Sequence, residues 1–107
     1  MIGKQDVLDC FSGLSERDLS NWAGHSAFLR LWHSRSGTER DALARAVGEI
    51  IEESDDGKIV ADLIHLVTVL RITQAYPSID RLKSSGRFLG DTVVQEMLAY
   101  NSGVRQP

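Results

Sequence analysis

One histidine and one carboxylate in this chain have a spacing that could support acid–base chemistry. His65 follows Asp62 by three residues in a long apolar stretch that we expect to be helical. Residues three apart share a helix face, so the carboxylate could orient the imidazole as a general base, and a small hydrolase is one hypothesis. A polar stripe continued by Thr68 and Arg71 explains the same residues without catalysis. Because no nucleophile or oxyanion-hole motif accompanies them, we favour a protein that is not an enzyme.

A second candidate site is the segment SDDGKI, residues 54–59, which matches part of a calcium-binding EF-hand loop. If Gly57 took the sixth position of such a loop, Leu63 would take the twelfth, where the loop requires a bidentate carboxylate. We therefore interpret the segment as a turn in which one aspartate caps the following helix. Nor do the three histidines form a metal-ligand pattern: they are His25, His33 and His65. The sequence predicts no metal and no cofactor.

The most informative charge pattern is a run of acids that no base interrupts. Between Arg45 and Lys58 the chain carries five carboxylates: Glu49, Glu52, Glu53, Asp55 and Asp56. Two of them fall near the C-terminal end of a predicted helix, where the helix dipole disfavours negative charge. A solvated turn is one interpretation. We expect instead a negative surface for a basic partner, with Tyr76 or Tyr100 as an exposed aromatic anchor.

The element that must position these residues is the stretch from Lys58 to Tyr76. It is apolar at most positions, too long for a typical strand, and therefore predicted to be a helix covered on several sides. Its interruption by Asp62, His65 and Arg71 argues against a membrane span. We expect residues 58–76 to form the central helix of a single domain, residues 1–107.

Apolar residues at three- and four-residue steps, together with capping residues and glycines, predict further helices around this one. We expect them between Gly3 and Gly13, Ser15 and Gly24, Ser26 and Trp32, Thr38 and Ser54, Pro77 and Gly86, and Asp91 and about Asn101. Gly48 lies inside one of them and indicates close approach by another helix. The predicted fold class is all-α, a compact bundle of six or seven short helices around a central apolar helix.

Composition narrows the class of partner and compartment. The 107 residues have a net charge of −3, and their basic residues are scattered, so we expect no nucleic-acid partner. The single cysteine, Cys10, excludes an internal disulfide, favours a reducing compartment and is expected to pack as a small apolar group. Met1 to Phe11 has no apolar run typical of a secretory signal. We expect a cytoplasmic protein that does not bind a membrane.

Two resemblances accompany these patterns. The segment ALARAVGEIIEESDDGKIVADLIHLV, residues 42–67, resembles one HEAT-type helical hairpin, without a period that repeats it. The acidic group from Glu49 to Asp56, in an all-helical layout, is similar to that of small bacterial immunity proteins of contact-dependent inhibition systems. That resemblance implies a protein, monomeric when free, that neutralises a basic toxin such as a nuclease by occluding its active site. The alternative is a helical adaptor or regulatory subunit that acts through protein–protein contacts.

Overall fold

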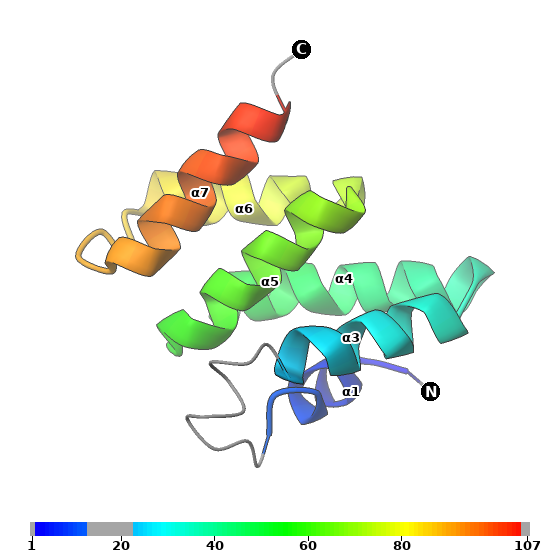
Figure 1. The fold of residues 1–107 in the computed structure, drawn as a ribbon. Helices are drawn as coiled ribbons and strands as arrows, with labels where there is room; N and C mark the ends of the chain where they lie inside the picture. Colours follow the sequence, from blue (N-terminus) through cyan, green and yellow to red (C-terminus); the bar gives the residue numbers. More distant parts are fainter. Residues whose placement is uncertain (1, 13–22, 106–107) are drawn as a thin grey trace.

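The computed structural model describes residues 2–12 and 23–105, and within these ranges the chain forms helices and no strands (Figure 1). The helices are α1 (Lys4–Asp9), α3 (Ala23–Ser34), α4 (Gly37–Glu53), α5 (Gly57–Leu70), a 3-10 turn η1 (Thr73–Ala75), α6 (Tyr76–Ser85) and α7 (Thr92–Arg105). The all-α prediction is confirmed. Most of the helix expected between Ser15 and Gly24 lies outside the described residues.

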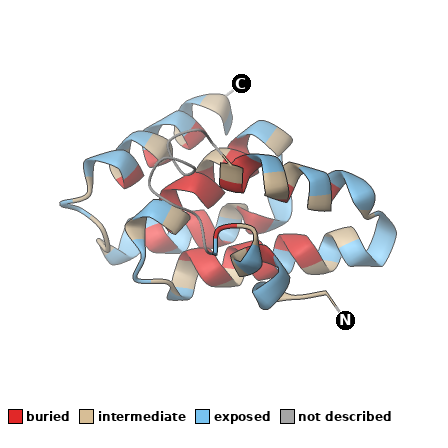
Figure 2. Cartoon of the chain, turned by 60° about the horizontal axis from the view of Figure 1, so that its bottom comes forward, coloured by how far each residue is buried: buried red, intermediate tan, exposed pale blue. Residues whose placement is uncertain are grey.

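The central position of α5 follows from its composition. Its apolar residues are buried on nearly all sides, and Figure 1 shows the helix lying between α3 and α7, with α4 behind it. Figure 2 shows that buried residues concentrate where the helices face one another, with exposed residues on the outside. Burial of a helix on several faces requires neighbours on each of them, as the sequence predicts.

The predicted C-terminal boundary of this helix, Tyr76, is wrong by six residues. The helix ends at Leu70, because Arg71 adopts the left-handed conformation with φ 54°. The amide of Ile72 then donates to the carbonyl of Val67 at 3.0 Å, and Ile72 itself is buried. This is a Schellman motif with its apolar contact, formed without the glycine that usually marks it. Tyr76 therefore begins α6, and Pro77 lies in the first turn of that helix.

Close packing of α4 against α6 confirms the expectation for Gly48. A Cβ atom at this position would lie 2.7 Å from Oγ of Ser78 and 3.9 Å from Cα of Ala75. The absence of a side chain therefore lets the start of α6 approach the backbone of α4. This approach brings the polar residues of α6 within reach of the last turns of α4.

Three other predicted helix ends are also wrong. Gly24 does not end a helix: it lies inside α3, and its Cα faces the ring of Phe11, which fills the space of a side chain. The N-cap of α4 is Ser36, not Thr38, because the helix begins two residues earlier than predicted, at Gly37. The last helix continues beyond Asn101 to Arg105, where the Arg105 guanidinium donates to both carboxylate oxygens of Asp80 on α6.

Candidate functional site

The acidic turn, by which we mean residues Glu49 to Asp56, joins the end of α4 to the start of α5. Asp56 caps α5, because its Oδ1 accepts hydrogen bonds from the amides of Lys58 at 3.0 Å and Ile59 at 3.3 Å. The hydroxyl of Ser54 accepts a further bond from the amide of Asp56 at 3.0 Å. The predicted aspartate cap is confirmed, and these bonds hold the turn in one conformation.

Glu52 turns towards α6 and is paired there. Its carboxylate accepts from Nε of Arg81 at 2.5 Å, from Nη2 of the same guanidinium at 2.9 Å and from Oγ of Ser78 at 2.8 Å. Bidentate pairing with arginine is the strongest common form of an exposed ion pair. The hydrogen bonds from Arg81 and Ser78 lower the pKa of Glu52 to about 2. This carboxylate is part of the α4–α6 packing.

Arg87, in the loop after α6, explains why acids are tolerated at the end of α4. Its guanidinium donates to the backbone carbonyls of Glu52 and Ser54, the latter at 2.5 Å. These carbonyls lie at the negative end of the α4 dipole, so the cation offsets the repulsion that Glu52 and Glu53 would otherwise feel. The same guanidinium lies 3.5 Å from Oδ1 of Asp55.

Lys4, on α1, neutralises the remaining face of the turn. Its Nζ lies 2.9 Å from Oε2 of Glu53 and 3.8 Å from Oε2 of Glu49, and hydrogen bonding to Glu53 raises the pKa of the lysine. Four of the five carboxylates of the acidic turn thus meet three cations of the same chain, and the fifth, Asp56, caps α5. Asp55 has a fully exposed side chain. The uniformly unpaired acidic surface expected from the sequence is not what the structure shows.

Tyr76 is covered by another side chain of the same protein. It is half-buried at the start of α6, beneath the guanidinium of Arg105, which is 4.5 Å from the ring centroid. Ser78, two residues further along α6, donates to Glu52 at 2.8 Å, so the start of α6 lies beside the last turns of α4. The ring of Tyr76 itself is engaged by Arg105, at the end of α7. It is therefore not the freely exposed anchor that the sequence predicts.

A feature that sequence analysis missed is the loop from Gly86 to Asp91, which adjoins the turn (Figure 1). A Cβ atom at Gly57 would overlap the Asp91 carboxylate and lie 3.5 Å from Cε1 of Phe88, so loop and turn are in contact. Phe88 adopts φ 61°, and its carbonyl accepts from Nε2 of Gln95 at 2.9 Å. Held in this way, the loop leaves Leu89 exposed to 73%. The sequence signal for this loop was the apolar pair Phe88–Leu89 between Gly86 and Gly90.

The histidine site differs from the one predicted. Asp62 contacts Nε2 of His25, on α3, at 3.2 Å and Nζ of Lys58 at 3.1 Å. Burial alone would raise the pKa of Asp62, but the hydrogen bonds from His25 and Lys58 outweigh burial and lower it. The carboxylate assigned to His65 is therefore engaged with another helix. His25 and Asp62 are both buried, so this pair lies where a substrate could not reach it without movement of α3.

His65 lies between two other rings. Its centroid is 5.1 Å from that of His25 and 5.8 Å from that of Tyr100 on α7. Burial, followed by the charge of His25, lowers the pKa of His65, which favours the neutral imidazole at neutral pH. The arrangement joins α3, α5 and α7 through ring contacts, tilted between the two histidines and stacked between His65 and Tyr100. Such packing accounts for the presence of His65 and Asp62 in α5 without a catalytic role.

Neither a metal centre nor an activated thiol is found in the part of the chain that the structure describes. Its His, Cys, Asp and Glu side chains form no group of three suited to a metal ion. Cys10 is half-buried, its Sγ donates to the carbonyl of Asp6 at 3.5 Å, and burial raises the pKa of the thiol. A raised pKa lowers the thiolate fraction, so the structure agrees with a packing role for Cys10.

Comparison with models of protein families, with curated proteins and with solved structures finds no match to this chain. The class that the structure itself defines is an all-α helical bundle. Among the described residues, no helix is both long enough and apolar enough to cross a membrane. The functional argument therefore depends on the geometry of the described surfaces.

Proposed function

We propose that this chain is a non-enzymatic protein-binding inhibitor of the bacterial immunity type. It would act in the cytoplasm, as a monomer when free, on a basic toxin domain such as a nuclease. Its carboxylates would meet the cations with which the toxin holds its substrate, and the bundle would block entry. Opposed charges of this kind raise association rates and select partners.

The observation that carries this proposal is the state of Asp55. Its carboxylate is fully exposed at the tip of a turn whose backbone is held by the Asp56 cap, the Ser54 hydroxyl and the Arg87 guanidinium. A charge presented from a fixed backbone loses little conformational entropy on binding. Glu53 and Glu49 are partly exposed and share one lysine, so they add negative charge beside it.

Affinity capture with charge-reversed chains tests the proposal. The wild-type chain, an Asp55→Lys/Glu53→Lys chain and a Glu39→Lys/Asp41→Lys chain are immobilised and exposed to extract of the source cell. The last is a matched control, because it makes the same charge change near the opposite end of α4, about 20 Å from Glu53. We expect a basic protein on the wild-type and control chains, with at least about tenfold less on the Asp55/Glu53 variant.

The captured protein is then assayed for its own activity. An equimolar amount of the wild-type chain should abolish that activity, and the Asp55/Glu53 variant should not. Equal capture by all three chains would contradict the proposal, as would a captured protein that is acidic or that keeps its activity in the complex.

A further inference from the structure

The described surface has few large apolar side chains in contact with water, and they are not evenly distributed. The four are Val69, Leu89, Val93 and Tyr100, with exposed fractions of 52, 73, 50 and 44%. Three of them fall within twelve consecutive residues, in the loop before α7 and on α7 itself. Single exposed apolar residues are ordinary on a protein surface, but a cluster marks a candidate contact surface.

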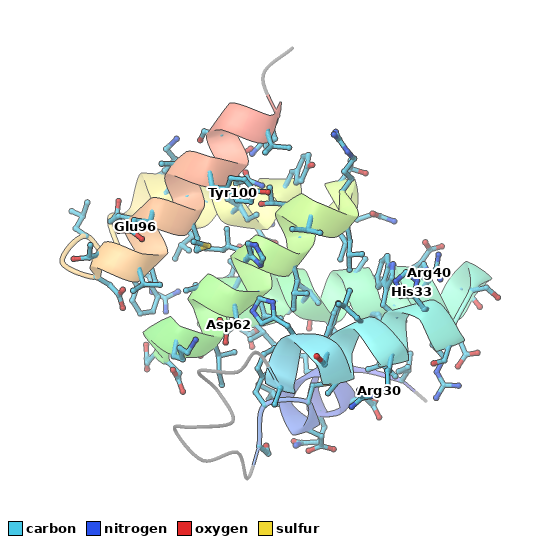
Figure 3. All side chains as sticks on the ribbon, viewed as in Figure 1. Arg30, His33, Arg40, Asp62, Glu96 and Tyr100 are labelled. Atoms are coloured by element: carbon cyan, nitrogen blue, oxygen red, sulfur yellow. The ribbon has the colours of Figure 1, made fainter. Side chains whose placement is uncertain are left out.

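Helical spacing places part of this cluster on one face. Val93, Glu96 and Tyr100 follow one another by three and four residues, and Figure 3 shows the last two on α7. Leu89 precedes them in the loop, four residues before Val93. The inner face of α7 is formed by Val94, Leu98 and Asn101, which are buried against the rest of the bundle, and Tyr100 lies at its border, stacked on His65 but 44% exposed. We call the outer set, Leu89, Val93, Glu96 and Tyr100, the α7 strip.

The strip is presented by a backbone that is already held in place. Asp91 Oδ1 accepts from the amide of Val94 at 3.0 Å, which caps α7. The carbonyl of Phe88 accepts both the amide of Asp91 and the side chain of Gln95. Arg87 joins the loop to the end of α4. A partner would therefore meet Leu89 with little further ordering of the loop, which favours affinity.

The charge around the strip indicates what kind of partner fits it. Glu96 lies within the strip, and Asp91, Asp55 and Asp56 lie at its N-terminal end, where the loop packs on the acidic turn. Among the described residues, the cations at that end are Lys58, which bonds to Asp62, and Arg87, which bonds mainly to backbone carbonyls. Within residues 2–12 and 23–105, four carboxylates stand against two cations at this end, so the described surface there is negative and would repel a second copy of the chain.

We propose that the α7 strip is a docking surface for a basic amphipathic helix of a partner protein. The partner's apolar side chains would pack on Leu89, Val93 and Tyr100, while its Lys or Arg side chains would pair with Glu96 and Asp55. This inference rests on the proposed function, since it names the part of the basic partner that is held. Most of the binding free energy should come from Leu89, because a buried apolar anchor contributes more than an exposed ion pair.

Synthetic helical peptides serve as the probes. One carries leucines at helical spacing flanked by lysines, the second replaces each leucine by serine, and the third replaces each lysine by glutamate. Binding to the full chain is measured by fluorescence anisotropy and located by amide chemical shifts. We expect the lysine–leucine peptide alone to bind, with its largest shifts between Leu89 and Tyr100, and to bind more weakly as salt is added.

Two variants make the test specific. The double variant Leu89→Ser/Val93→Ser should lower the affinity for the lysine–leucine peptide at least about tenfold. Val69 is an exposed apolar residue on α5, and Val69→Ser should change that affinity less than about twofold. Circular dichroism checks that each variant is folded. Equal weakening by Val69→Ser, equal binding of the serine peptide, or no binding of any peptide would overturn the inference. So would a stable homodimer in sedimentation that Leu89→Ser dissociates.

The inference and the proposed function fail in different ways. If the Asp55/Glu53 reversal abolishes capture of a basic protein but Leu89→Ser/Val93→Ser does not, the inhibitor function stands and the α7 strip does not. If the lysine–leucine peptide binds the strip but no basic protein is captured, the docking surface stands without the inhibitor function.

Discussion

Two pairs of carboxylates in this molecule have contrasting surroundings. Glu52 and Asp62 point inwards, where Arg81, Ser78, His25 and Lys58 bond to them. Asp55 and Glu96 point outwards, and the first of these is fully exposed. The inward pair joins helices, so its removal should lower stability. The outward pair contributes little to the fold, so its removal should affect only binding. A charge pattern along the chain does not separate these two uses; the partner of each carboxylate does.

The largest effect on stability is expected at Asp62. Asp62→Ala removes the buried acceptor that bonds to His25 and Lys58, and the free energy of unfolding should fall by about 3 kcal/mol, measured by urea denaturation. Asp62→Asn keeps an acceptor oxygen, so its free energy of unfolding should fall by less. A loss below about 0.5 kcal/mol for Asp62→Ala would show that the α3–α5 contact does not depend on this carboxylate.

An intermediate effect is expected at Glu52, and it should depend on pH. The folded pKa of Glu52, about 2, lies below its ordinary value of 4.5, so the unfolded chain takes up the proton first as the pH falls. The stabilisation is therefore complete above pH 4.5 and is lost as the pH falls from 4.5 to about 2. Glu52→Gln should lower the free energy of unfolding at pH 7 by about 1 kcal/mol, because Arg81 is exposed and water screens the pair.

The same substitution should make stability less dependent on pH in that window, which urea titrations at several pH values would measure. Glu53→Gln provides the matched comparison, since its partner, Lys4, is also exposed but contacts it through one oxygen. An unchanged pH dependence in Glu52→Gln would contradict the inward assignment of Glu52.

The smallest effect on stability is expected at Asp55. Asp55→Lys should change the free energy of unfolding by less than about 0.5 kcal/mol, because the side chain is fully exposed and its contact with Arg87 is 3.5 Å long. Thermal and urea denaturation would measure it. A larger loss would place Asp55 with the inward carboxylates and remove the contrast from which the proposed function is argued.

Local signals predicted much of this fold because they arise within a few residues. The caps at Asp56 and Asp91, the first-turn Pro77, the terminal Gly86 and the close approach at Gly48 all follow from residue type and short spacing. The end of α5 was predicted wrongly for the converse reason. Arg71 takes a left-handed conformation that residue type disfavours, and burial of Ile72 stabilises it.

The candidate sites were harder to predict because their partners are distant in the chain. Glu52 meets Arg81 and Arg87, and Glu53 meets Lys4 from the opposite direction along the sequence. Helical spacing paired Asp62 with His65, whereas tertiary packing supplied His25 from another helix. A run of like charges therefore predicts where carboxylates gather, but only the packing of the helices decides which of them stay available to a partner.

The guanidinium of Arg87 has a consequence for how this sequence could vary. Because it occupies the carbonyls that end α4, it makes acidic residues acceptable at a position where they would otherwise be selected against. Substitutions of Arg87 and of Glu52 and Glu53 should then be epistatic. Loss of Arg87 would be tolerated only in a sequence in which these two glutamates had already been replaced by neutral residues.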